Sequence, residues 1–559
     1  MQVNYSELSD YEARGRIEKF SAIFSLIILG LTICLLGLSI HGLFDVNETR
    51  YAASAVEMVR SGNYLVPTFN GEPRMDHPVF YYWLLAGFYQ IFGFSPGSFR
   101  LVSALFAFGL IMAVGRIVHR ESRVEGGFLA GVILATSSFF AYMGRVAVAD
   151  MVFSVFLFLS SLLLYMGTFD AKRVDRLLVR AGVCIMALAL ITKGIAGAIL
   201  PLLCLFLFSW LNGRLKRMVR ALADWKALVL FFLIALPWYV ALHLQMGPEF
   251  FNAYIGKSIG RILSASSDHP GPVYYYVPVV FLGMFPWSLF LPQTVFSILR
   301  ERGFSLKAVG ENISLDMFLL LFSCVIFIYF SLSSEKVATY ILSIFPALAI
   351  MVGLFLEKVI LNEKVSDLGF VTGSYAYSIC CSFLGILMIY PKEYFPVISE
   401  AGLSKLLFYP GGLLLVGGFF VGLFAVFRRN IKRVRVKIFA AMLIPQLLFL
   451  WFVFFAVLPG VYEYRQMDLQ KISRFLNKEE NKDSPVIFYR KFKPSVVYFT
   501  GKKVHSAKSF EDVVAYTLHR KNAYVIFPGA DPSVKLSSLG TVSAVYRGKL
   551  YSLYRVRLK

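Results

Sequence analysis

The sequence predicts an α-helical protein that crosses a membrane many times and carries a small α/β domain at its C-terminal end. Of its 559 residues, 57% are hydrophobic and 16% are aromatic, and the mean hydropathy is +0.66. Apolar runs of about 20 residues recur along the chain, which is the length that a helix needs to cross the hydrocarbon core of a bilayer. From residue 459 onward the apolar runs become shorter, as in a water-soluble domain.

Residues 1–458 form the predicted membrane domain, with about thirteen transmembrane helices and a first outer loop at 42–99. Lys and Arg collect in the short loops between apolar runs, most densely at 428–437, and such loops face the cytoplasm. All of these loops reach that side only if segment 79–94, rich in Tyr, lies along the membrane surface without crossing it. The first outer loop and residues 459–559 then share the opposite side of the membrane.

Residues 459–559 contain the predicted α/β domain. Three apolar segments, 484–489, 523–528 and 541–546, have the composition of buried strands, and 510–521 has the spacing of a helix. The sequence of this domain contains no phosphate-binding loop, no GxSxG motif and no metal-ligating cluster. It therefore offers no catalytic motif of its own.

The net charge of +22 would suggest a nucleic-acid partner in another protein. Here the basic residues report membrane topology and contact with anionic lipids, so we expect no nucleic-acid partner. The six cysteines lie in apolar stretches without ligand spacing, which predicts neither a disulfide framework nor a zinc site. The mixed-charge residues 1–19 precede a long apolar run, which favours an uncleaved membrane anchor over a signal peptide.

The first outer loop concentrates polar chemistry before and after a segment with helical spacing, which Gly62 should end. A structural role is equally compatible with the start of this segment, since Asn47 is a good helix N-cap and Glu48 suits the helix dipole. The polar residues of the loop are Asp45, Asn47, Glu48, Arg50, Asp76 and His77.

Further charged residues gather on the same predicted face, where charges beside a bilayer are costly unless they are paired or hydrated. Their convergence predicts a cavity whose Arg and Lys would bind phosphate and whose carboxylates would bind hydroxyls or an amine. A transporter also keeps ionisable groups in the membrane, but its site usually lies near the midplane. The further residues are Arg145, Asp150, His243, Lys257, Arg261, Asp268, His269, Lys336 and Tyr340.

Several short motifs resemble, in their order, the GT-C class of integral-membrane glycosyltransferases that use polyprenyl-phosphate sugars. This class includes protein O-mannosyltransferases and the bacterial aminoarabinose lipid A transferase. The similarity begins with NETRYAASAVEM, SGNYLVPTFNGEP and DHPVFYYW in the first outer loop. It continues through GRVAVADM, ITKGIAGAILP, LPWYV, GRILSASSDHPGPVYYYVP, FPWS and SSEKVATYILSIFPALA, and covers nearly the whole chain.

The resemblance implies site residues wherever the motifs match. Two positions depart from the family pattern: Asn47 replaces its usual aspartate, and His77 replaces its usual lysine. An asparagine cannot accept a proton, and a histidine carries charge only when protonated. The implied catalytic residues are Asn47, Glu48, Asp76 and Asp150. The residues implied to bind the donor phosphate or lipid are Arg50, Tyr51, His77, Arg261, Lys336 and Tyr340.

The implied reaction moves a sugar, aminoarabinose or a related one, from undecaprenyl phosphate to a lipid A phosphate. It would take place at the periplasmic face of the bacterial inner membrane, with the protein as a monomer among membrane lipids. An ionised acceptor phosphate needs no strong base, which would tolerate Asn47. No cofactor is required, although Asp76 and His269 could hold a divalent cation.

Two alternatives stay open at this point. Transfer to Ser or Thr hydroxyls, as in protein O-mannosyltransferases, would need a base to remove the hydroxyl proton. A polyprenyl-lipid flippase is the alternative from another class of protein, and it would make no free polyprenyl phosphate.

Overall fold

The structure is a computed structural model, in which residues of the chain are described over eleven ranges. Within them the chain is predominantly helical, and a small sheet lies near the C-terminus. The ranges are 5–74, 76–121, 124–170, 173–263, 270–302, 314–361, 367–391, 402–478, 484–517, 522–529 and 540–558.

Eight helices among the described residues are long and apolar enough to cross a membrane, or nine if a helix pair bent by 109° counts as one span. Three shorter apolar helices accompany them, so the expected count of about thirteen remains a prediction. Seven of these eight spans lie in or contain α4 (Pro96–Glu121), α7 (Ala149–Tyr165), α11 (Trp225–Leu263), α15 (Leu315–Leu332), α16 (Phe345–Leu361), α17 (Leu368–Ile389) and α20 (Ser404–Val426). The eighth, Val434–Leu476, contains both α21 (Val434–Phe452) and α22 (Leu458–Leu476). The shorter ones lie in α1 (Tyr5–Leu35), α5 (Val124–Thr136) and α9 (Ala196–Leu211).

Two helices form the centre of the membrane bundle. The span that begins with α7 is 89% buried and the span that contains α16 is 78% buried, whereas the span in α11 is 22% buried. Close approach between α16 and α5 requires a glycine: a Cβ on Gly353 would lie 2.8 Å from the backbone of Ala130. Small residues permit such contacts between transmembrane helices, where dispersion forces depend on close packing.

The hairpin of α8 (Arg176–Lys193) and α9 turns at Gly194. Gly194 follows α8 with a φ of 94°, a left-handed conformation that favours glycine. Lys193 is therefore the last residue of α8, at the turn into the next helix.

The first outer loop forms α2 (Asn47–Ser61), a hairpin of β1 (Thr68–Phe69) and β2 (Glu72–Pro73), and α3 (Phe80–Phe92). Gly62 ends α2 with a φ of 70°, as expected. Helix α3 has 13 residues, fewer than the roughly 20 that a membrane span requires. The expectation that 79–94 does not cross the membrane agrees with this length.

The C-terminal domain contains a five-stranded sheet with the order β4-β3-β5-β7-β6. Strand β3 pairs in parallel with β4 and β5, whereas β7 pairs antiparallel with β5 and β6. A continuous helical segment, Val434–Leu476, carries the chain from the bundle into this domain. The remaining elements are β3 (Val486–Tyr489), α23 (Pro494–Thr500), β4 (Val504–Ala507), α24 (Phe510–Thr517), β5 (Asn522–Pro528), β6 (Gly540–Arg547) and β7 (Tyr551–Leu558).

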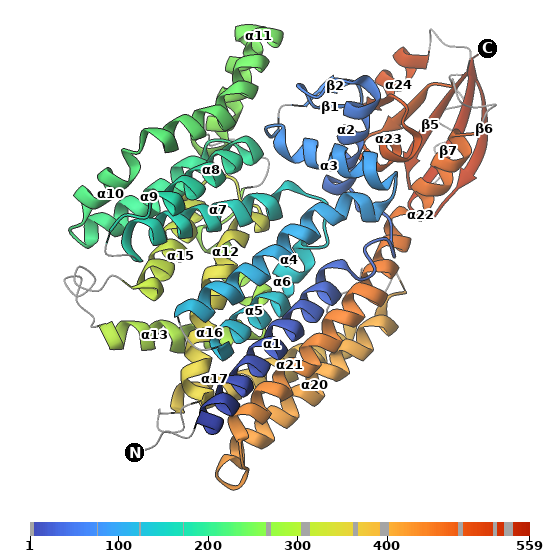
Figure 1. The fold of residues 1–559 in the computed structure, drawn as a ribbon. Coiled ribbons are helices and arrows are strands. Elements are labelled where there is room, and N and C mark those ends of the chain that lie inside the picture. Colours follow the sequence, from blue (N-terminus) through green and yellow to red (C-terminus); the bar gives the residue numbers. More distant parts are fainter. Residues whose placement is uncertain are drawn as a thin grey trace.

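The first outer loop and the C-terminal domain lie together at one end of the bundle, and the turn between α20 and α21 lies at the other (Figure 1). The side chain of Asn70 joins the first outer loop to the C-terminal domain by forming two hydrogen bonds with the backbone of one residue of β4. Its Nδ2 donates to the Val504 carbonyl and its Oδ1 accepts from the Val504 N–H, both at 2.8 Å. Asp45 also accepts hydrogen bonds from the Ser495 N–H and hydroxyl, at 2.8 and 2.7 Å.

This arrangement leads to a prediction about orientation. The basic loop at 428–437 should hold its end of the bundle in the cytoplasm, so the C-terminal domain at the opposite end should be exported. A phosphatase that works only after export should therefore be active when it is fused behind residue 559. The measurement is phosphatase activity in whole cells. Strong signal from a cytoplasm-only reporter at the same fusion point would reverse the orientation.

Candidate active site

A pocket of about 600 Å³, part of it open to solvent, lies between the first outer loop and the outer ends of α7, α8 and α15. Such a concave site, with a few polar groups among apolar side chains, is typical of ligand binding. Its lining residues are His77, Phe153, Lys193, Ile195, Ala196, Tyr329, Phe330, Ser333, Glu335 and Tyr340.

Lys193 is the lysine that lines this pocket, at the end of α8. Its Nζ donates to Asp150 Oδ1 at 2.5 Å, and the Thr339 hydroxyl donates to the same oxygen at 2.5 Å. The side chains of Lys193 and Asp150 are only 10% and 13% exposed. The Lys193 ammonium has three N–H donors, and among the described residues its one hydrogen-bond acceptor is Asp150. The other donors remain available to an anion in the pocket.

Aromatic rings surround this cation. Lys193 Nζ lies 4.4 Å from the ring centroid of Tyr340 and 5.3 Å from that of Phe153. Tyr340, from the 3-10 helix η4 (Ala338–Ile344), donates its hydroxyl proton to Glu335 Oε2 at 3.2 Å. The Lys193 side chain is only 10% exposed among these groups, and Coulomb interactions with a bound anion are stronger for a largely buried cation.

His77 forms the side of the pocket that the first outer loop provides. Its ring stacks on Tyr51, with the ring centroids 6.1 Å apart and the planes 10° apart. Tyr51 is 3% exposed, and the Arg74 guanidinium lies 4.4 Å from its ring centroid. Burial raises the pKa of Tyr51 well above its ordinary value, so the phenol stays protonated. Tyr51 therefore positions His77 as part of a stacked platform.

Asp76 directly precedes the pocket residue His77 in the chain and lies beside two arginines. Its Oδ2 accepts from Arg74 Nε at 3.1 Å and lies 4.0 Å from an Arg50 terminal nitrogen. The side chains of Arg50 and Asp76 are 34% and 31% exposed, so both reach solvent. The Asp76 carboxylate is therefore engaged by two arginine side chains.

Glu48 lies elsewhere, in a buried ion pair with Arg100 of α4. The carboxylate accepts from Arg100 Nε at 2.9 Å, from a terminal nitrogen of Arg100 at 2.8 Å, and from the Ala147 and Phe44 N–H groups at 2.8 Å. Burial acts to raise the pKa of Glu48, but Arg100 and the backbone donors hold the pKa below its usual value. With four donors on its oxygens, Glu48 is a structural anchor, and the expectation of a catalytic role is not supported.

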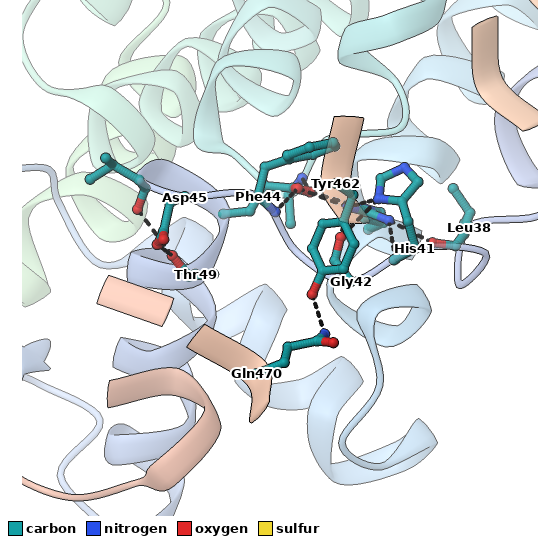
Figure 2. Close-up of polar contacts among 12 residues, drawn as sticks. Leu38, His41, Gly42, Phe44, Asp45, Thr49, Tyr462 and Gln470 are labelled. Atoms are coloured by element: carbon teal, nitrogen blue, oxygen red, sulfur yellow. Dashed lines mark hydrogen bonds and ion pairs between the residues drawn. The ribbon is translucent and has the colours of Figure 1, made fainter. Parts of the chain in front are cut away.

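The same arginine organises the turn that precedes α2. Arg100 donates to the carbonyls of Leu38, His41 and Gly42 at 2.8 to 3.0 Å. Figure 2 shows this turn, with Tyr462 of α22 beside it and Gln470 donating to the Tyr462 hydroxyl. Burial, together with the charge of Arg100, lowers the pKa of His41 to about 4. The network joins the first outer loop to α4 and to the helix that enters the C-terminal domain.

The structure corrects the expectation for Lys336. Its Nζ donates to the carbonyls of Phe330, Ser331 and Ser333, at 3.2 and 2.7 Å for the first two, and the residue is 6% exposed. These carbonyls belong to the C-terminal end of α15, where a cation satisfies unpaired acceptors and the helix dipole. The ammonium therefore caps a helix and does not point toward a phosphate in the pocket.

The other expected site residues differ in what the structure shows of them. Asn47 is exposed at the start of α2, and Val46 occupies the N-cap position, so neither the expected cap nor a pocket contact is present. Arg261 lies near the end of α11, and its side chain falls outside the described part. His269 lies outside the described residues altogether.

Metal binding was expected as an option at Asp76 and His269. The described residues contain no group of three or more His, Cys, Asp or Glu side chains that could hold a metal ion. Asp76 is instead occupied by Arg50 and Arg74. We predict that turnover survives treatment with EDTA, because Lys193 and the arginines can neutralise phosphate without a metal. A complete loss of turnover that one added metal restores would contradict this prediction.

Two charged pocket residues, Lys193 and Glu335, were not identified from the sequence as site residues. In the sequence, Lys193 and Gly194 lie between two short apolar runs within 178–211, a position typical of a turn. A signal was nevertheless present, since a lysine at the outer end of an apolar helix has to be paired or to face a polar cavity.

Sequence comparison supports the resemblance. The profile described as "Dolichyl-phosphate-mannose-protein mannosyltransferase" matches residues 76–240. An undecaprenyl phosphate-alpha-4-amino-4-deoxy-L-arabinose arabinosyl transferase of Shewanella sediminis is 27% identical over 454 residues, covering 79% of this chain and 77% of that protein. A protein of the same name followed by the number 1, from Pseudomonas fluorescens, is 29% identical and covers 59% of this chain and 57% of its own length.

Structure comparison gives the same result. ArnT from Cupriavidus metallidurans bound to undecaprenyl phosphate superposes with a TM-score of 0.76 at 18% identity, covering 95% of this chain and 97% of that one. The archaeal oligosaccharyltransferase AglB from Archaeoglobus fulgidus gives a TM-score of 0.53 at 11% identity, covering 92% of this chain and 69% of that one. Together these comparisons support a GT-C glycosyltransferase of the ArnT and protein mannosyltransferase type. The fold expected from the motifs is thereby confirmed, including the small C-terminal sheet domain.

The matched region contains part of the pocket. The profile match includes His77, Asp150 and Lys193, which the fold brings together from the first outer loop, α7 and α8. Tyr340 and Glu335 join them from a segment outside that match. The pocket with the Lys193 ammonium and its surrounding aromatic rings thus lies at the end of the bundle where the first outer loop lies (Figure 1).

Proposed function

We propose that this GT-C glycosyltransferase moves aminoarabinose or a related sugar from undecaprenyl phosphate to a phosphate of lipid A. The reaction takes place at the periplasmic face of the bacterial inner membrane. The names of the curated relatives and the undecaprenyl phosphate bound to ArnT support the choice of donor. The observation that carries the proposal is the Lys193 ammonium in the pocket, held by Asp150 and with N–H donors to spare.

Lys193 stabilises the leaving phosphate. When the bond between the anomeric carbon and the donor oxygen breaks, the bonding electron pair stays on that oxygen, and undecaprenyl phosphate gains negative charge. A fixed ammonium in a water-poor site stabilises this charge more in the transition state than in the ground state. Asp150 and Thr339 position Lys193 for this role, and His77 extends the site toward the outer loop.

Arg50 suits the acceptor phosphate. Its side chain is 34% exposed beside Asp76, and guanidinium groups bind phosphate oxygens with two parallel hydrogen bonds. An ionised phosphate oxygen can attack the anomeric carbon without losing a proton. The exposed Asn47 and the arginine-bound Asp76 are compatible with such a reaction, because it requires no general base.

A second acceptor class follows from the profile match to protein mannosyltransferases. A Ser or Thr hydroxyl has to lose its proton, and Asp76, next to His77 in the chain, is a partly exposed carboxylate that could accept it. The two acceptors give different outcomes when Asp76 is replaced by asparagine. Transfer to a hydroxyl should fall by roughly a hundredfold or more, the range of general base catalysis, whereas transfer to a phosphate should change far less.

Mass spectrometry of lipid A tests the proposal in cells. Lipid A from a strain that lacks the gene should lose the added sugar, and expression of the full chain should restore it. Expression of the Lys193→Met variant should not. An unchanged lipid A in the deletion strain, under conditions that produce the modified form in the parent, would exclude lipid A as the acceptor.

A further inference from the structure

We propose that Glu335 selects a donor sugar that carries a protonated amine, and so sets the substrate class of the reaction. This inference rests on the proposed function. It concerns a residue that has no place among the site residues implied by the resemblance.

The Glu335 carboxylate lines the pocket and has capacity for a ligand. It lies in the short segment between α15 and η4, next to Lys336. The Tyr340 hydroxyl, 3.2 Å from Oε2, is its one hydrogen-bond donor among the described residues. A carboxylate offers about four lone-pair positions, so most of its acceptor capacity is left for a bound molecule.

Neighbouring cations do not neutralise Glu335 within the described chain. The Lys336 ammonium is directed at the carbonyls of α15, and the Lys193 ammonium is paired with Asp150. The pocket therefore keeps one carboxylate without an ion-pair partner from the described residues. Negative charge in a partly buried site favours a cationic ligand and disfavours an anionic one.

Tyr340 links the two charged parts of the pocket. Lys193 Nζ lies 4.4 Å from its ring centroid, and its hydroxyl contacts Glu335. The Lys193 cation thus lies against the ring of Tyr340, and the Glu335 anion lies at its hydroxyl. A pyranose with an anomeric phosphate and an amine across the ring has the complementary pair of charges on one six-membered ring. Its phosphate would bind Lys193, and its ammonium would bind Glu335.

Other sugars fit this pair less well. A sugar carboxylate would be repelled by Glu335, and a neutral sugar would give it only a hydroxyl hydrogen bond. Glu335 could instead serve only to hold Tyr340 in place. Replacement of the carboxylate would then reduce turnover equally for all donors, because only the shape of the pocket would change.

The test compares two donors that differ in charge: undecaprenyl phosphate aminoarabinose, and the same lipid with its amine formylated and thus neutral. kcat/KM is measured for both with purified full-length wild type, Glu335→Gln, Glu335→Asp and the control Glu301→Gln. Glu301 is an exposed residue of α13 (Leu291–Arg302) that pairs with Lys358. We expect wild type to prefer the amine donor, and Glu335→Gln to lower that preference by about 10- to 100-fold, the range of a charge-assisted hydrogen bond.

Glu335→Asp should keep part of the preference, and Glu301→Gln should keep all of it. The inference is overturned if Glu335→Gln retains the wild-type preference, or if it loses turnover equally on both donors. In both of these outcomes the wild-type protein still turns over its donor, so the proposed function stands while the inference fails. A wild-type protein that uses neither donor overturns the proposed function itself, and the inference with it.

Discussion

Replacement of Lys193 by methionine is expected to lower kcat by about a hundredfold or more, because one fixed cation beside a developing oxyanion contributes about 2–4 kcal/mol. Methionine keeps most of the length of the side chain and removes the charge. Since the change also leaves Asp150 without its ion-pair partner, the double variant Lys193→Met/Asp150→Asn is measured beside it. Both variants should lose turnover, and the double variant should regain stability that the single variant loses.

The matched control for this prediction is Lys336→Met. Lys336 caps the end of α15, so its loss should lower the unfolding temperature while turnover per folded molecule stays close to wild type. The comparison separates a cation in the pocket from a cation at a helix end. Near wild-type turnover in Lys193→Met, at full expression, would show that the donor phosphate binds elsewhere.

Replacement of Arg100 by methionine is expected to destabilise the protein by about 3–5 kcal/mol, the usual cost of leaving one buried charge without its partner. Glu48 is 2% exposed, and Arg100 also satisfies the carbonyls of the turn at Leu38–Gly42. The measurements are thermal unfolding in detergent and the amount of protein in the membrane. The double variant Glu48→Gln/Arg100→Met should recover part of the loss, because it removes the unpaired carboxylate.

A control and a pH series complete this test. Glu301→Gln breaks an exposed pair and should change stability by less than about 1 kcal/mol. The pKa of Glu48 is lowered from 4.5 in the folded state, so its contribution is present above that pH and is lost as the pH falls below it. The pKa of His41 is lowered from 6.5 to about 4, so stability should begin to fall between these values. Full stability of Arg100→Met at pH 7 would contradict the anchoring role.

Much of the fold follows from local patterns that the sequence displays openly. The helical spacing of 47–61, the stop at Gly62 and the turn at Gly194 depend on neighbouring residues, and all three were predictable. Strands β4 and β7 were not predicted, although YSLYRVRL in β7 alternates polar and apolar residues. Strand β4 has only four residues, and its pairing with β3 is a long-range property.

The candidate site was less predictable because its contacts join distant segments. Lys193 meets an aspartate 43 positions away, and Thr339 reaches the same carboxylate from 189 positions away. The sequence predicts the end of the bundle at which Lys336 lies, but it does not predict the direction of the Lys336 side chain. That direction depends on unpaired carbonyls at the end of α15, which appear only once the helix and the following turn have formed.

The release of free undecaprenyl phosphate tests the central proposal most directly. Purified full-length protein in detergent is mixed with undecaprenyl phosphate aminoarabinose and lipid A, and both lipid products are followed by mass spectrometry. We predict equal amounts of free undecaprenyl phosphate and modified lipid A, with product formation at least about a hundredfold slower for Lys193→Met. An intact donor lipid, with no free undecaprenyl phosphate from wild type on any acceptor, would contradict the proposed transfer and favour a flippase.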